Sequence, residues 1–284
     1  MAQTKREIQQ WLTQANTEPR HRFGQNFMID ANLVRLVADA ARIVPNELVL
    51  EVGPGTGTLT EELLARQAKV VAIEIDRDLA ALLRDRWQSE AKFTLIEGDA
   101  LAGKHAINPE LHEHIQAARR SGRGVKLVAN LPYNIASPLV IELLIAGVDL
   151  LAFTVQKEVA DRLRATEISD AYGPLSVMSQ LLAKVELMRT LPPQAFWPMP
   201  KVESALVRME RADHLGSQAD AFSRWVHAFF SGRRKTLRNA LLMASDLPDA
   251  EGALRGVGLD PQLRPDQLSP AQCLTLYRSI TPAA

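Results

Sequence analysis

One arrangement near the start of the chain constrains the fold more than any other: a β-branched run, a glycine-rich turn and a helical segment in immediate succession. Residues 48–52 (LVLEV) predict a buried strand, residues 53–57 (GPGTG) a turn, and residues 58–65 an amphipathic helix. This order begins a nucleotide-binding βαβ unit, in which Gly53 and Gly55 let the backbone approach a ligand and the helix N-terminus adds donors. The sequence therefore predicts an α/β fold with a mostly parallel sheet.

The spacing of the glycines narrows the kind of ligand. The turn has the pattern G-x-G-x-G, and Thr58 stands at the sixth position, where the dinucleotide fingerprint has glycine. This departure disfavours a nicotinamide dinucleotide and suits a smaller adenosine ligand without a pyrophosphate.

Acidic residues follow the next two predicted strands. Residues 69–76 form the second strand, and Glu74 lies about 20 residues beyond the glycine turn, where a carboxylate binds ribose hydroxyls. Asp76 is expected to cap the following helix. Asp99 ends a third strand and can accept a hydrogen bond from an adenine amine. Alone it indicates no more than a solvated turn, but Gly53, Glu74 and Asp99 at three successive strand ends favour a shared site.

A fourth predicted strand, residues 126–129, stops at an unusual group of side chains. Asn130 offers a carboxamide oxygen, the carbonyl of Leu131 or Pro132 offers a second acceptor, and Tyr133 offers a flat face. Together they can bind a flat ring that carries an exocyclic amine. The alternative is that these residues only mark the end of a strand, and the motif alone does not decide between the two.

Four other segments have more than one interpretation or no chemical role. Phe153, in a fifth predicted strand, either packs in the core or faces Tyr133 across an adenine. Residues 25–27 are a lid over a ligand or a strap across the domain, and the strap is favoured. Residues 103–124 hold three histidines but read as a surface helix and loop rather than a metal site. Residues 202–209 alternate as expected for a last edge strand.

The character of the chain changes after residue 211. Residues 1–211, with an N-terminal extension at 1–20, predict one domain, and residues 212–284 predict a helical domain that binds RNA. The formal net charge of the 284 residues is zero, so a basic cluster is a local feature. We expect this cluster to bind phosphates; its members are Arg233, Arg234, Lys235 and Arg238.

The chain is expected to work in the cytoplasm and away from membranes. Its N-terminus lacks the apolar stretch of a signal peptide, and no run approaches the roughly 18 apolar residues that span a bilayer. The single cysteine, Cys273, rules out an intrachain disulfide and fits a reducing compartment.

Nine segments, taken in order, resemble the ribosomal RNA adenine dimethyltransferase family from about residue 20 to near the C-terminus. Two departures stand out: Met28 stands where the family usually has leucine, and the segment between Asp99 and Lys126 is long. The segments are QNF (25–27), EVGPGTG (51–57), EID (74–76), GDA (98–100), NLPYNI (130–135), FTVQKEV (153–159), YGPLSV (172–177), PKVESA (200–205) and RRKTLRN (233–239).

The resemblance implies a Rossmann-like fold with a mostly parallel seven-stranded sheet and a small all-α C-terminal domain. It implies transfer of methyl groups from S-adenosylmethionine, without a metal, to the N6 amines of two adjacent adenosines near the 3′ end of 16S rRNA. The substrate would be a small ribosomal subunit or its precursor, and the enzyme a monomer. By the same resemblance, Tyr133 and Phe153 hold the flipped adenine. The residues placed around the cofactor are Asn26, Met28, Gly53, Gly55, Glu74, Asp99 and Asn130.

Two alternatives stay open from the sequence. One is a sister enzyme that methylates large-subunit rRNA and confers antibiotic resistance; residues 172–174 and 233–239 favour the small-subunit member. The other is a ribosome-assembly or transcription factor that keeps the fold without the activity.

Overall fold

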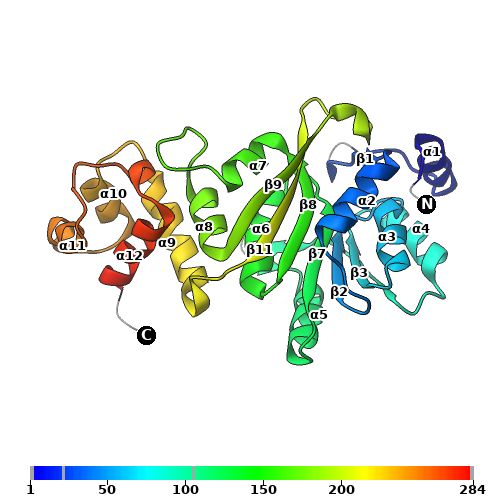
Figure 1. The fold of residues 1–284 in the computed structure, drawn as a ribbon, viewed down its shortest axis with the longest axis horizontal. Helices are drawn as coiled ribbons and strands as arrows, with labels where there is room; N and C mark the ends of the chain where they lie inside the picture. The colour runs from blue at the N-terminus through cyan, green and yellow to red at the C-terminus, as the bar shows by residue number, and fades with distance from the viewer. Residues whose placement is uncertain (1–2, 21–22, 104–105, 282–284) are drawn as a thin grey trace. The chain divides into compact units, whose positions relative to one another are not determined.

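The computed structural model describes residues 3–20, 23–103 and 106–281, and most of its strands form one seven-stranded sheet (Figure 1). The strand order is β4-β3-β2-β7-β8-β11-β9. Neighbouring strands from β4 to β8 run parallel, and β11 pairs antiparallel with β8. The strands are β2 (Leu48–Val52), β3 (Lys69–Glu74), β4 (Phe93–Glu97), β7 (Val125–Asn130), β8 (Leu150–Gln156), β9 (Ala183–Leu191) and β11 (Ser204–Arg211). The predicted mostly parallel, seven-stranded sheet is confirmed.

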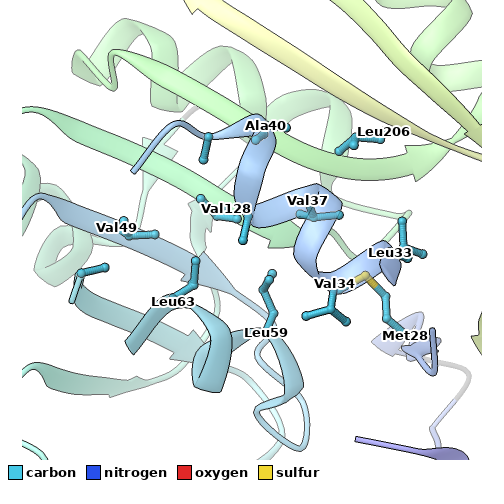
Figure 2. Packing of buried hydrophobic residues seen from close by; sticks show 14 of the residues in the cluster. Met28, Leu33, Val34, Val37, Ala40, Val49, Leu59, Leu63, Val128 and Leu206 are labelled. Atoms are coloured by element: carbon cyan, nitrogen blue, oxygen red, sulfur yellow. The ribbon is translucent and has the colours of Figure 1, made fainter. Parts of the chain in front are cut away.

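Helices connect the parallel strands and pack against the sheet, as crossover connections require. Figure 2 shows side chains of α2 and α3 against those of β2 and β7, for example Val37 and Leu63 beside Val49 and Val128. Full burial of each such aliphatic side chain stabilises the fold by about 1.5–3 kcal/mol. The connecting helices are α3 (Thr58–Ala65), α4 (Arg77–Trp87), α5 (Pro109–Arg120) and α6 (Ala136–Ala146); α2 (Ala31–Ala40) precedes β2, and α7 (Lys157–Leu163) follows β8.

The strand predicted at residues 202–209 is not an edge strand. As β11 it lies between β8 and β9, and it pairs with β8 from Ser204↔Gln156 to Glu210↔Leu150. The edge position belongs to β9. Alternation of apolar and polar residues reports which face of a strand is buried, not whether both of its hydrogen-bonding edges have a neighbour, so the sequence could not reveal this position.

The N-terminal segment forms a helix and a short strand outside the seven-stranded sheet. Helix α1 (Lys5–Gln14) begins with a capping box made by Thr4 and Glu7. Strand β1 (Phe27–Met28) pairs antiparallel with β10 (Phe196–Trp197). This pairing supports the interpretation of residues 25–27 as a strap.

The histidine-containing segment forms the two-stranded ladder β5 (Leu101–Gly103) and β6 (Ala106–Ile107), followed by α5. Its His105 lies outside the described residues. Across the described part of the chain, no group of three His, Cys, Asp or Glu side chains is placed to hold a metal ion.

By their internal contacts, the residues fall into two compact units. The first runs to Ala160 and resumes from Glu186 to Arg211; the second combines Asp161–Val185 with the residues from Ala212 onward. The second unit therefore includes α8, which the sequence-based division at 211 assigns to the first domain. Its helices are α8 (Pro174–Leu182), α9 (Ala219–Ser231), α10 (Leu237–Ala244), α11 (Ala250–Gly256) and α12 (Pro270–Ile280).

A stripe of aromatic side chains forms the core of the second unit. Trp225 stacks on Phe229 with ring centroids 4.8 Å apart, and Tyr277 of α12 packs edge-on against Phe222 at 5.2 Å. Trp225, Val226, Phe229 and Phe230, which lie along α9, are all buried.

None of the helices within the described ranges is long and apolar enough to cross a membrane.

Candidate functional site

An open pocket lies in the first unit at the carboxyl ends of β2, β3 and β7, where ligands bind in sheets of this type. Residues 23–28, which are the strap with its flanking residues and are called the strap from here on, line one side of the pocket. The glycine turn lines another side. Its lining includes three acidic residues, Glu51, Glu74 and Asp99, while none of the described lining residues is Lys, Arg or His. Such a lining attracts a cation and repels a phosphate.

The glycine turn approaches the pocket in a conformation that requires glycine. Gly53, Gly55 and Gly57 have positive φ angles of 69°, 62° and 84°. A Cβ on Gly55 would lie 2.8 Å from the ring of Phe27, so a larger residue would displace the strap. The backbone N–H of Gly55 donates to Glu74 Oε2 at 3.1 Å.

Glu74 lies at the centre of this arrangement, as predicted. Its side chain is buried, and its second oxygen accepts from the backbone N–H of Asp76 at 3.0 Å. Burial raises the pKa of Glu74 to about 7, against which the hydrogen bonds from Asp76 and Gly55 act. A carboxylate oxygen can accept two hydrogen bonds, so each oxygen keeps capacity for a ligand hydroxyl.

Asp76 has the capping role expected of it. Its Oδ1 accepts from the backbone N–H of Asp78 at 3.2 Å at the start of α4. It also forms an ion pair with Arg20 at 2.9 Å and accepts from Gln25 Nε2 at 3.0 Å. Asp76 thus attaches the N-terminal segment to the sheet and is not a pocket residue.

Glu51 also lines the pocket, although no role is predicted for it from the sequence. It accepts from Thr60 Oγ1 at 2.7 Å, and burial raises its pKa to about 8. The signal that could have found it was an acid inside an otherwise apolar strand. Thr58 was weighed only as a departure from the glycine pattern, yet it lines the pocket too, and its buried hydroxyl has no hydrogen-bond partner among the described residues.

The remaining predicted cofactor residues also reach this pocket. Asn26 and Met28 line it from the strap, and Asp99 lines it from the end of β4. Asp99 Oδ1 accepts from the backbone N–H of Leu101 at 3.0 Å, and Asn108 Nδ2 donates to the Asp99 carbonyl at 3.0 Å. The long segment after Asp99 thus supplies a side chain that fixes this turn.

Asn130 is held from two sides. Thr154 Oγ1 donates to its Oδ1 at 2.5 Å, and its Nδ2 donates to the carbonyl of Asn26 at 2.6 Å. The carboxamide therefore links β7 to β8 and to the strap. Its orientation is set before any ligand arrives, and Oδ1 keeps a second lone pair for a donor.

The residues after Asn130 differ in whether they line the pocket. The carbonyl of Pro132 accepts from the backbone N–H of Ile135 at 3.2 Å and keeps one lone pair, so the carbonyls of Leu131 and Pro132 both stay candidates for the second acceptor. Pro132 lines the pocket, whereas Leu131 and Tyr133 are not among its lining residues. The Tyr133 hydroxyl hydrogen-bonds with Ser204 Oγ at 2.7 Å, and burial raises its pKa.

Phe153 is fully buried in β8, between β7 and β11, and is not among the pocket-lining residues. The structure therefore does not bring Phe153 together with Tyr133 at this pocket. Its placement beside a flipped adenine stays a prediction.

The basic cluster lies in the second unit, in the turn between α9 and α10 and in the first turn of α10. Arg233, Arg234 and Lys235 are exposed there. Arg238 forms an ion pair with Glu251 of α11 at 3.2 Å. The sequence around the cluster lacks acids, but the fold brings one to Arg238, so the free positive charge is concentrated in the first three residues.

Comparisons with known proteins agree on one family. A model described as "Ribosomal RNA adenine dimethylase" matches residues 16–281. The ribosomal RNA small subunit methyltransferase A of Magnetococcus marinus is 40% identical over 278 residues, which cover 96% of each chain. The enzyme of the same name from Pseudomonas aeruginosa is 39% identical over 266 residues, covering 92% of this chain and 94% of its own.

Solved structures give the same fold. A dimethyladenosine transferase from Plasmodium falciparum has a TM-score of 0.70 at 24% identity, covering 88% of this chain and 95% of its own. The 23S rRNA methyltransferase ErmE has a TM-score of 0.63 at 27% identity, covering 90% of this chain and 99% of its own.

Proposed function

The chain belongs to the ribosomal RNA adenine dimethylase family, and from this membership and its pocket we propose that it dimethylates adenosine in rRNA with S-adenosylmethionine as methyl donor. The substrate would be the N6 amine of two adjacent adenosines near the 3′ end of 16S rRNA, in a small ribosomal subunit or its precursor. The relatives that support a small-subunit substrate are 38–40% identical to this chain and carry that substrate in their name.

One observation carries the donor assignment. The pocket presents the acidic side chains of Glu51, Glu74 and Asp99 and, among its described lining residues, no basic side chain. A dinucleotide cofactor would bring its phosphates into a lining that has acids and no cation to pair with them. A positively charged adenosine derivative fits this lining.

S-adenosylmethionine, when bound, supplies a methyl group on a positively charged sulfur. Glu74 would accept hydrogen bonds from ribose hydroxyls, and Asp99 from an adenine amine. Gly53 and Gly55 give the backbone close approach. The strap residues Asn26 and Met28 would complete the pocket and exclude water from it.

The amine of the target adenosine would bind where β7 ends. Asn130 Oδ1 and the Leu131 or Pro132 carbonyl would accept its two hydrogens and so orient its lone pair. The bonds from Thr154 and to Asn26 fix the Asn130 carboxamide, so little reorganisation is needed. Tyr133 and Phe153 would hold the flipped base. Once alkylated, the nitrogen is acidic, and its proton passes to water.

Binding of the RNA would use the exposed cations of the second unit. Arg233, Arg234 and Lys235 present three positive charges in one turn, suited to the phosphate backbone. We assign residues 212–284 to RNA binding and the first unit to methyl transfer, in a reducing, cytoplasmic compartment that fits the single cysteine, Cys273.

The test uses purified protein, labelled S-adenosylmethionine and undermethylated small and large ribosomal subunits, followed by nucleoside analysis of each RNA. Dimethyladenosine is expected in the small-subunit RNA alone. Label in the large subunit would favour the activity named for ErmE, to which the structure is similar. RNA binding without label in either subunit would indicate a factor that keeps the fold but not the catalysis.

A further inference from the structure

We propose that Gln3, with helix α1 behind it, is a positioning residue that holds the glycine turn in its cofactor-binding shape. The inference rests on the proposed function, because it concerns the S-adenosylmethionine pocket. It extends that function to an N-terminal segment that does not line the pocket and lies before residue 16, where the family match begins.

Gln3 and Thr56 form a closed pair of hydrogen bonds across more than fifty residues of sequence. Gln3 Nε2 donates to the Thr56 carbonyl at 3.1 Å, and Thr56 Oγ1 donates to Gln3 Oε1 at 2.7 Å. Both residues are buried, with exposed fractions of 4% and 1%. Both polar groups of the Gln3 side-chain amide are thus bonded to Thr56, one to its carbonyl and one to its hydroxyl, at the tip of the glycine turn.

The turn needs a contact of this kind because its glycine-rich sequence does not favour one backbone conformation. Thr56 stands between Gly55 and Gly57, both at positive φ, and glycine visits many other conformations at little cost. The neighbouring residue, Gly55, gives its N–H to the pocket carboxylate of Glu74. If Thr56 moves, the backbone of Gly55 would move with it, and the N–H that Gly55 donates to Glu74 would be displaced. Gln3 therefore acts on the pocket through Thr56 and Gly55.

Helix α1 supports the same turn by a second, apolar route. Its buried residues Ile8 and Leu12 belong to one hydrophobic cluster with Phe27 of the strap. The Phe27 ring lies over Gly55, so close that a Cβ there would be 2.8 Å away. Helix α1 thereby packs behind the Phe27 ring, which faces the glycine turn. Gln3, which precedes the helix, bonds to the tip of the same turn.

Arg86 of α4 completes the attachment. Its Nη1 donates to the Thr56 carbonyl at 2.7 Å, and its guanidinium stacks on Trp11 of α1 with 4.7 Å to the ring centroid. The carbonyl would therefore keep one donor without Gln3. The Thr56 hydroxyl would lose its acceptor in a buried place, which predicts a partial, measurable loss rather than collapse of the turn.

The experiment compares Gln3→Ala with the matched control Gln10→Ala, which removes an exposed glutamine from helix α1. Calorimetric titration with S-adenosylmethionine, without RNA, gives both the dissociation constant and the binding stoichiometry. We expect Gln3→Ala to raise the dissociation constant about tenfold at full stoichiometry, and Gln10→Ala to match the wild type. In turnover, KM for S-adenosylmethionine should rise while kcat at saturation is kept.

A merely structural role gives a different result. Loss of folded protein would lower the stoichiometry and kcat at an unchanged dissociation constant, and that outcome, like an unchanged affinity, overturns the inference. Thr56→Val supplies an independent check, because it removes the hydroxyl that Gln3 accepts from. Gln3→Ala and Thr56→Val together should be no worse than either alone; additive losses would also overturn it. Failure of the wild type to bind S-adenosylmethionine would instead remove the proposed function.

Discussion

The pocket of the first unit and the basic turn of the second place acidic and basic groups in opposite surroundings. In the pocket, Glu51 and Glu74 are buried carboxyls, each hydrogen-bonded to groups that are fixed by the fold. In the basic turn, Arg233, Arg234 and Lys235 are exposed to solvent.

The difference teaches how each region can act. A buried polar group is costly to leave unpaired, so a single substitution in the pocket should have a large and specific effect. Exposed cations act through their sum and through counterion release, so each contributes little and salt weakens them all. The predictions below test this contrast, beginning with the largest expected effect.

Asn130→Ala should reduce methyl transfer by about 10²–10³-fold, because it removes an acceptor that is already oriented for the amine. RNA affinity should stay within about twofold of the wild type, since the RNA phosphates are bound elsewhere. Single-turnover methylation and filter binding measure the two quantities. Asn32→Ala, an exposed asparagine of α2, is the control. Equal losses in transfer and RNA binding would contradict the separation of the two regions.

Glu74→Gln should weaken S-adenosylmethionine binding by about 30-fold, because the amide replaces one acceptor oxygen of a buried carboxyl with a donor. Titration calorimetry without RNA measures it. The matched control is Glu97→Gln, which pairs with Glu74 in register on β4 but is exposed and paired with Arg84. If both variants bind equally well, Glu74 is not a cofactor residue.

Changing Arg233, Arg234 and Lys235 together to Ala should lower RNA affinity by about tenfold at physiological salt. The slope of log affinity against log salt should become flatter by about 2, because roughly 0.7 is lost per phosphate contact. Affinity for S-adenosylmethionine should not change. Three exposed arginines of the first unit, Arg35, Arg120 and Arg123, serve as the control set. An unchanged salt slope would move the RNA surface to another part of the molecule.

The smallest effect concerns stability and pH. Burial raises the pKa of Glu51 to about 8, whereas the unfolded chain ionises this carboxyl near its ordinary value of 4.5. The folded protein keeps a proton that the unfolded chain releases, so the free energy of unfolding should fall as the pH rises through this interval. Glu51→Gln removes this term while it keeps an acceptor for Thr60.

The stability of Glu51→Gln relative to the wild type should therefore improve between about pH 5 and pH 8 and level off above about pH 8. Urea denaturation across this range measures the difference. Glu97→Gln, an exposed carboxyl, should show no such trend. A pH-independent difference for Glu51→Gln would mean that the carboxyl is not protonated in the folded protein.

Local sequence determined most of the first unit. The strand at residues 48–52 and the helix at residues 58–65 were predicted with the bounds that the structure has, because their patterns depend on residues close by in the sequence. The cap at Asp76 was also predictable, since a short polar side chain before an apolar helix has few other uses. So was the shared edge of Gly53, Glu74 and Asp99, because parallel strands end on the same side.

Tertiary structure alone decided how these groups are paired. Gln3 hydrogen-bonds with Thr56, Asn130 hydrogen-bonds with Thr154 and Asn26, and Arg238 forms an ion pair with Glu251. In each case no periodic pattern in the sequence relates the two partners. The raised pKa of Glu51 has the same origin, since it depends on the burial that neighbouring elements impose. A sequence pattern records which face of an element is apolar. It does not record which other element covers that face. The sequence therefore determined the strands and the functional side chains at their ends, and only the packing decided which atoms hold those side chains in place.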